Sequence, residues 1–232
     1  MFIYLTESNM NFQGGDNNLS RNFYKIVLDY IKNGQKILNL GCGILFNFEK
    51  VVFENKNIKS TSIDVIDIQE LNIKKPYFID NFLVMSVENS FILENKFDVV
   101  TFFELIEHVD NTDVLLENCF NNLKDDGLLI FSFPNLASVY ARIELLFGFQ
   151  PHILEVSNVK ANFGAGIFGK LNNSKNVPLH HIRGITNRAM REMLDFNNFK
   201  IVKIIGYEYR FKRLFRFFPS FAPVNIVICK KK

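Results

Sequence analysis

The feature that most constrains the fold is an alternation of strand-length apolar segments with segments of helical pattern. Between the apolar segments lie stretches that can carry helices, and Thr112–Leu123 places apolar side chains along one helical face. Strands that alternate with helices predict an α/β protein with a doubly wound, mostly parallel, Rossmann-like sheet covered on both sides. The five expected strands of this region are Lys36–Leu40, Ser60–Asp64, Phe82–Ser86, Phe97–Phe103 and Leu128–Phe133.

The segments on either side of this region complete the expected order of elements. Ser20–Lys32 has apolar residues at helical spacing, with Ser20 placed to cap the start and Gly34 just beyond the end. Further along the chain, one helix and two strands are expected at Thr186–Asp195, Lys200–Ile205 and Val224–Cys229.

A chain of 232 residues fits one globular domain with one sizeable insertion. Ser138–Pro178 loosens into an apolar helix and then a stretch rich in glycine and asparagine, which we interpret as a lid-like insertion that covers the site. We therefore expect a single domain, 1–232, made of an N-terminal helix region, a cofactor-binding core, the insertion and the C-terminal part of the sheet, at residues 1–34, 35–135, 138–178 and 179–232.

Composition argues against several classes of protein. The 27 basic and 24 acidic residues are well mixed, which argues against nucleic acid as the main partner. Three cysteines without CxxC spacing fit a reducing compartment better than a disulfide scaffold. No apolar run approaches the roughly 20 residues that span a bilayer, and no export signal is visible at the start. The expected location is the cytoplasm.

The segment "YRFKRLFRFFPSF", residues 209–221, departs from the mixed charge pattern because basic and aromatic residues alternate in it. One interpretation is a basic amphipathic helix that makes peripheral contact with the inner face of the membrane. The other is that the aromatic side chains pack on the last strands while the basic side chains stay in water. We favour the second, since a strand is expected immediately afterwards.

Two motifs at expected strand ends point to a nucleotide-like ligand. "ILNLGCGIL" places Gly41 and Gly43 directly after a strand, where a turn of glycines lets the backbone come close to a ligand. In "TSID", Asp64 ends the next expected strand, and its two carboxylate oxygens match the two hydroxyls of a ribose. NAD-linked dehydrogenases share both features, but their G-x-G-x-x-G pattern would need glycine at Phe46.

Together with "FDVVTFFELIEHV" and "LKDDGLLIFSFPN", these motifs resemble class I S-adenosylmethionine-dependent methyltransferases from Lys36 to Asn135. In this sequence Asn39 stands where the family usually has an acidic residue, and Leu45 stands near a frequent third glycine. The resemblance implies S-adenosylmethionine as cofactor and S-adenosylhomocysteine as product. The cofactor-binding residues that it implies are Asn39, Gly41, Cys42, Gly43, Asp64, Val65, Ser86, Val87 and Glu104.

The charged cluster in "FELIEHV" follows the fourth expected strand. A helix there would place Glu104, Glu107 and His108 on one face. The structural interpretation is that Glu107 and His108 pair with each other or anchor the turn. Alternatively, His108, His180 or His181 acts as the general base that removes a hydroxyl proton. We assign catalytic roles to Glu107, His108 and His181.

A third interpretation of the same cluster is a metal site. Glu-x-x-Glu-His with a later histidine is similar to the metal-binding pattern of quinone-pathway and small-RNA methyltransferases. That resemblance implies a divalent metal held by Glu104, Glu107, His108 and His181.

The acceptor is suggested only by resemblance. "PNLASVYARIELLFGFQPHILEVSN" followed by "HHIRGIT" is similar to bacterial methyltransferases of cell-surface polysaccharide synthesis. It implies O-methylation of a sugar or glycan hydroxyl on a small-molecule or sugar-linked acceptor. The alternatives are a quinone or phenol O-methyltransferase with a divalent metal, and a non-catalytic cofactor-binding partner protein, which the altered first motif would fit.

Overall fold

A computed structural model describes residues 17–43, 45–55, 62–67, 75–171, 178–208 and 211–232. The first two residues of the expected strand Ser60–Asp64 and part of the Gly- and Asn-rich stretch lie outside these residues. None of the described helices is long and apolar enough to cross a membrane.

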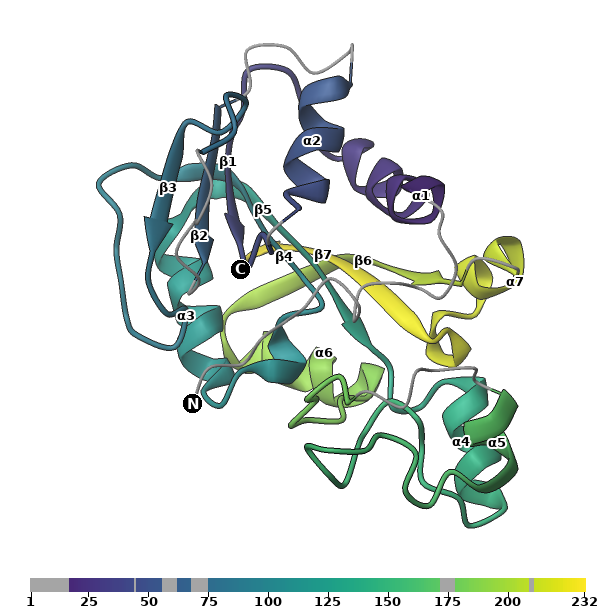
Figure 1. The fold of residues 1–232 in the computed structure, drawn as a ribbon. Coiled ribbons are helices and arrows are strands. Elements are labelled where there is room, and N and C mark those ends of the chain that lie inside the picture. The colour runs from purple at the N-terminus through teal and green to yellow at the C-terminus, as the bar shows by residue number, and fades with distance from the viewer. Residues whose placement is uncertain (1–16, 44, 56–61, 68–74, 172–177, 209–210) are drawn as a thin grey trace.

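Seven strands form one sheet in the order β3-β2-β1-β4-β5-β7-β6 (Figure 1). Neighbours from β3 to β5 pair in parallel, and β7 runs antiparallel to both β5 and β6. This order confirms the doubly wound, mostly parallel sheet. The order in which the chain adds strands reverses between β1 and β4, and sheets of this kind bind ligands at that point. The strands are β1 Lys36–Leu40, β2 Ser62–Asp67, β3 Asn81–Val84, β4 Phe97–Phe103, β5 Leu123–Pro134, β6 Phe199–Tyr207 and β7 Val224–Lys231.

Helices cover the sheet on both faces. Figure 1 shows α1 and α2 on one face and α3 and α6 on the other, while α4 and α5 of the insertion lie beyond the end of β5. The α-helices are α1 Asn17–Leu28, α2 Asn47–Glu54, α3 Thr112–Asn122, α4 Val139–Leu146, α5 Gly166–Leu171, α6 Asn187–Phe196 and α7 Lys212–Phe217, and the short 3-10 helices are η2 Ile106–His108 and η3 Pro219–Phe221.

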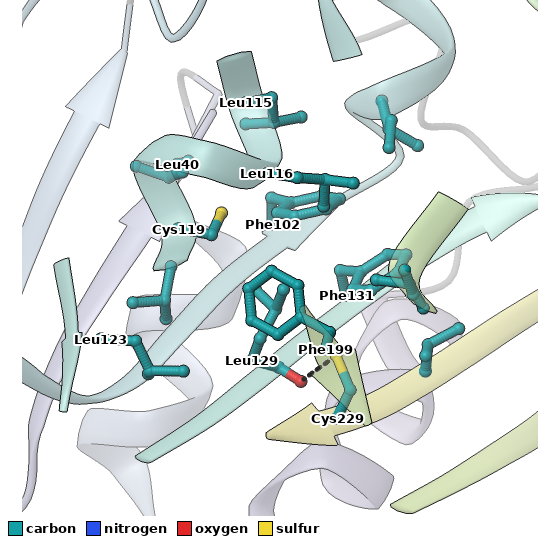
Figure 2. Packing of buried hydrophobic residues seen from close by; sticks show 14 of the residues in the cluster. Leu40, Phe102, Leu115, Leu116, Cys119, Leu123, Leu129, Phe131, Phe199 and Cys229 are labelled. Atoms are coloured by element: carbon teal, nitrogen blue, oxygen red, sulfur yellow. Dashed lines mark hydrogen bonds between the residues drawn. The ribbon is translucent and has the colours of Figure 1, made fainter. Parts of the chain in front are cut away.

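Alternate residues of β4 explain why the centre of the sheet is buried on both sides. Val99 faces the cluster of α1 and α2, whereas Phe102 faces the cluster of α3 and α6. In the second cluster Phe102 stacks on Phe131 with ring centroids 4.6 Å apart, beside Leu116 and Cys119 of α3 (Figure 2). With both faces filled by apolar side chains, polar chemistry is left to the ends of the strands, and sheets of this kind bind ligands at the carboxyl ends.

Several expected boundaries were wrong, each for a local reason. The first helix ends at Leu28 rather than Lys32, and the chain continues as turns to Gly34, whose φ is +77°. The strand β5 starts at Leu123 because Leu123 pairs with Phe97 of β4, and a register shift follows before Leu128 pairs with Val99. The strand β2 continues to Asp67, three residues past its expected end.

Candidate active site

The turn after β1 holds its backbone in left-handed conformations that favour glycine. Gly41 has φ +71° and Gly43 has φ +62°. A Cβ on Gly41 would lie 3.1 Å from Cδ1 of Leu105, so the turn passes close to the segment that follows β4. The N–H of Gly43 donates to Oδ2 of Asp67 at 3.0 Å, and Cys42 Sγ lies 3.5 Å from the same oxygen.

Asp67, rather than Asp64, is the carboxylate at the sheet edge. Asp64 pairs with Leu38 in the middle of β2, and its Oδ1 accepts a hydrogen bond from Asn81 at 3.0 Å. The expectation that Asp64 ends the strand is therefore wrong. The prediction ended the strand at the first aspartate of "DVID", but the strand continues through the buried Val65 to Asp67.

Asn39, at the position where the family usually has an acid, is joined to an acid from another element. Its Nδ2 donates to Oε1 of Glu49 at 2.6 Å, and its Oδ1 accepts from Thr101 at 2.8 Å. Glu49, in the first turn of α2, is fully buried, and its Oε2 has no hydrogen-bond partner among the described residues. Burial raises the pKa of Glu49 to about 7. Sequence reasoning missed Glu49 because nothing in the pattern links it to β1.

The segment after β3 is half-buried and tied to its neighbours. Ser86 Oγ accepts from the N–H of Glu88 at 3.2 Å, and Val87 O accepts from Asn118 at 2.9 Å. The Glu88 carboxylate in turn accepts from the N–H of Asp110 at 2.5 Å. These bonds hold Ser86 and Val87 at the carboxyl edge of the sheet, where β2 separates β3 from β1 and its glycine turn.

Glu104 does not lie on a helix, which corrects the expectation for "FELIEHV". Its φ is +47°, so the backbone turns sharply at the end of β4 before the single turn of η2. Its Oε1 accepts from Ser132 Oγ at 2.7 Å, which holds the carboxyl group near β5. Burial raises the pKa of Glu104 to about 7.

Glu107, His108 and His181 nevertheless converge. The Nε2 atoms of both histidines lie 3.9 Å from Oε1 of Glu107, and one ligand atom from each of the three residues lies within 4.8 Å of the others. Glu107 is fully buried, and neither of its carboxylate oxygens has a hydrogen-bond partner among the described residues. Burial, and then the neighbouring Glu104, raises the pKa of Glu107 well above its usual range.

Both imidazoles are oriented by backbone carbonyl groups. Nδ1 of His108 lies 3.1 Å from the carbonyl oxygen of His180, and Nδ1 of His181 lies 2.6 Å from that of Ile153. In the tautomer that donates these bonds, each Nε2 carries its lone pair toward Glu107. Burial lowers the pKa of His108 to about 4 and lowers that of His181. Both rings are therefore neutral at pH 7, and their Nε2 atoms with Glu107 form a donor set suited to a divalent metal.

The insertion holds His181 in place. The two carboxylate oxygens of Glu155 accept from the N–H groups of Leu179, at 2.7 Å, and His181, at 3.3 Å. The buried Glu144 of α4 binds His152 Nδ1 at 2.9 Å, next to the carbonyl of Ile153 that orients the His181 ring. His180 contributes its backbone carbonyl to the cluster rather than its side chain.

The fold and this edge of the sheet define the class of the protein, and solved structures agree. A methyltransferase from Archaeoglobus fulgidus described as S-adenosylmethionine-dependent superposes with a TM-score of 0.61 at 16% identity, covering 94% of this chain and 95% of that one. Magnesium protoporphyrin IX methyltransferase from Synechocystis PCC 6803, solved with bound S-adenosylhomocysteine, superposes with a TM-score of 0.56 at 13% identity over 93% and 83% of the two chains. The fold is that of class I S-adenosylmethionine-dependent methyltransferases.

The family described as "Methyltransferase domain" matches residues 16–204, and the chain belongs to it. Among curated relatives, the ubiquinone biosynthesis O-methyltransferase of Actinobacillus pleuropneumoniae serotype 7 is 29% identical over 124 residues, 47% of this chain and 52% of that protein. The (S)-coclaurine N-methyltransferase of Papaver somniferum is 33% identical over 106 residues, 43% of this chain and 29% of that protein. The matched region thus spans about half or less of the length of these relatives.

Proposed function

We propose that the protein transfers the methyl group of S-adenosylmethionine to a phenolic oxygen, with the acceptor hydroxyl bound at a divalent metal held by Glu107, His108 and His181. The observation that carries the proposal is the Glu107 carboxylate, buried between two imidazole Nε2 atoms without a hydrogen-bond partner in the described part of the chain. An ionised carboxylate buried alone costs several kcal/mol, which is why burial raises the pKa of Glu107, and a cation is the partner that would let these three donors bind with Glu107 ionised.

The residues of the cluster have separate roles in binding the metal and accepting the hydroxyl proton. When bound, a divalent metal supplies a Lewis acid that lowers the pKa of a coordinated hydroxyl. His108 and His181 act as neutral donors, because a pKa of about 4 makes His108 a weak base at pH 7. Glu104, adjacent to this cluster and with its pKa raised to about 7, is suited to accept the hydroxyl proton.

Alignment is the other requirement, because methyl transfer is an in-line displacement at the carbon attached to the sulfonium. The glycine turn, Asp67 and the segment of Ser86 and Val87 lie along the edge where the cofactor of this fold class binds. The insertion reaches the same edge through Ile153 and Glu155, so it would orient the acceptor and exclude water from it.

The name of the relative that is a ubiquinone biosynthesis O-methyltransferase supports an oxygen acceptor of a quinone pathway, for which we propose a phenol, whereas a sugar hydroxyl rests on the sequence resemblance alone. The two acceptors differ in acidity. A phenol, with a pKa near that of tyrosine at about 10, is readily ionised beside a metal, while a sugar hydroxyl requires far more assistance.

The test combines binding with turnover. Calorimetry would measure the affinity of the metal-stripped protein for Mg²⁺, Mn²⁺ and Zn²⁺, and methyl transfer would be assayed on a catechol and on nucleotide sugars. We expect metal binding and metal-dependent methylation of the catechol. Glu107→Gln should lower metal affinity by on the order of 100-fold or more while S-adenosylhomocysteine still binds, and the exposed Glu192→Gln serves as the charge-matched control.

Three results would contradict the proposal in distinct ways. Methylation of a nucleotide sugar but not of the catechol would establish the sugar acceptor. Catechol methylation that is unaffected by a chelator would show that the reaction does not require a metal. Cofactor binding without turnover on either acceptor, with or without metal, would favour a non-catalytic partner protein.

A further inference from the structure

The helix α4 exposes its large apolar side chains. Its buried positions are Ala141 and Glu144, whereas Leu146 is 79% exposed and Phe147, which follows the helix, is 66% exposed. The buried Glu144 binds His152, so this orientation is fixed by an internal hydrogen bond within the insertion. Helices of water-soluble domains ordinarily turn their apolar side inward. The outward side of α4 therefore needs an apolar environment that the described chain does not supply.

The segment from α7 to η3 also exposes large apolar side chains. Phe215 is its buried aromatic residue, while Phe217 is 79% exposed and Phe218 is 55% exposed. The favoured expectation, that these aromatic side chains pack on the last strands, is therefore wrong for Phe217 and Phe218. The N–H of Phe211 donates to Glu208 at 2.5 Å, which ties the start of this segment to the end of β6.

The helix α4 and the segment from α7 to η3 adjoin through η3. The guanidinium of Arg142 on α4 lies 5.0 Å from the ring centroid of Phe221 in η3, and Asn135 Nδ2 donates to the carbonyl oxygen of Ser220 at 3.1 Å. Figure 1 shows α4, α5 and α7 projecting beyond the same end of β5 and β7. We call this the α4–α7 surface and define it by Arg142, Leu146, Phe147, Arg213, Arg216 and Phe217, all of which are exposed.

The charge of the α4–α7 surface has one sign. Arg142, Arg213 and Arg216 are exposed, and residues 209–221 contain no acidic residue. In residues 136–149 the sole acidic residue is Glu144, which is buried and bound to His152. Arginines interleaved with protruding aromatic and leucine side chains match an interface of anionic headgroups above acyl chains.

We propose that the α4–α7 surface binds the surface of a bilayer that contains anionic lipid. Phe217, Phe147 and Leu146 enter the boundary between headgroups and acyl chains, while the arginines contact the phosphates. The protein lies on the bilayer and does not span it. Binding requires neither the metal nor the acceptor, so it stands or fails separately from the proposed function.

Vesicle co-sedimentation of the full chain tests this directly. The probes are vesicles of phosphatidylcholine alone and vesicles of equal parts phosphatidylcholine and phosphatidylglycerol. We expect binding to the second that weakens as salt is raised, because exposed charges are screened. Arg213→Gln with Arg216→Gln should lower the partition coefficient roughly five-fold per arginine. Lys50→Gln with Lys200→Gln, which removes the same charge from α2 and the start of β6, should leave it unchanged.

The apolar contribution is tested by Phe217→Ser with Leu146→Ser. Both side chains are exposed, so the variant should keep the wild-type melting temperature while its vesicle binding falls at least ten-fold. Equal binding to both kinds of vesicle, or arginine variants that bind like the wild type, would overturn the proposal. A protein that does not bind vesicles but forms a dimer in light scattering would also overturn the proposal, if the Phe217 and Leu146 substitutions dissociate that dimer. A second copy of the chain would then cover this surface.

Discussion

Glu107 and His181 meet across the edge of the sheet, with Nε2 of His181 3.9 Å from Oε1 of Glu107. Glu107 lies in the turn after β4, whereas His181 follows the insertion and is held by its residues. The backbone carbonyl of Glu107 also accepts from the N–H of Ile182 at 3.0 Å, so the two segments are joined by main chain as well as by side chains. The insertion is therefore part of the candidate site and not merely a cover over it.

Glu155→Gln tests this role of the insertion. The Glu155 side chain binds the backbone N–H of His181 and not its ring, and its two oxygens fix the backbone from Leu179 to His181. We expect the variant to bind Zn²⁺ or Mn²⁺ 10- to 100-fold more weakly, as for outer-shell substitutions in other metal sites, with unchanged affinity for S-adenosylhomocysteine. Calorimetry measures both. Wild-type metal affinity in the variant would show that Glu155 has a purely local structural role, and Glu192→Gln is again the control.

Asp67→Asn and Asp64→Asn test which of the two aspartates binds the ribose of the cofactor. The structure favours Asp67, whereas the sequence predicted Asp64. Asp67 adjoins the glycine turn, whereas Asp64 binds Asn81 in the middle of β2. Loss of a charged partner to the ribose hydroxyls costs roughly 1.5–3 kcal/mol. We therefore expect Asp67→Asn to weaken S-adenosylhomocysteine binding by at least ten-fold and Asp64→Asn to have little effect. The reverse order in calorimetry would restore Asp64 as the ribose residue.

The sequence predicted the sheet well because apolar runs of strand length carry direct information about burial. β1 and β4 were placed at their observed bounds, since both lie in the centre of the sheet and are bounded by charged or glycine residues. The end of β2 was misplaced because Asp64 lies within the strand, and hydrogen bonding to Asn81 of the neighbouring strand makes that possible. No local pattern reports a partner on another strand.

The candidate site was predicted in composition but not in geometry. Glu107, His108 and His181 were named from a motif, yet the helix that was to align them does not form, and a left-handed Glu104 with a 3-10 turn brings them together instead. Glu49 and Glu155 were missed because their partners belong to other elements of the fold. Long-range packing determines these contacts, and periodicity cannot show them.

Gly41→Ala tests the close approach at the glycine turn, and Gly34→Ala provides a matched control. Both glycines have similar φ, +71° and +77°, so each substitution should cost about 1–2 kcal/mol of unfolding free energy. Gly41 lies against Leu105, while a Cβ on Gly34 would meet none of the described residues within 4 Å. We expect both variants to lose similar stability in urea, but only Gly41→Ala to lose cofactor affinity. Equal cofactor affinity in the two variants would show that the turn does not approach the ligand.

Glu49→Gln tests the buried acid beside Asn39 through the pH dependence of stability. The pKa of Glu49 is raised to about 7 in the folded protein, so the folded state binds this proton more tightly than the unfolded chain. That contribution to stability is fully present below the unfolded pKa of about 4.3 and is lost as the pH rises through about 7. Glutamine keeps an oxygen for the Asn39 hydrogen bond and does not titrate.

The unfolding free energy of Glu49→Gln relative to wild type should therefore rise by roughly 3 kcal/mol between pH 4 and pH 8. Urea titrations at several pH values, without cofactor, would measure this difference. Glu192→Gln replaces an exposed carboxylate, with a side chain 69% exposed, and should show a nearly constant difference over the same range. Parallel stability curves for Glu49→Gln and wild type would mean that Glu49 titrates as in the unfolded chain, and that burial beside Asn39 does not raise its pKa.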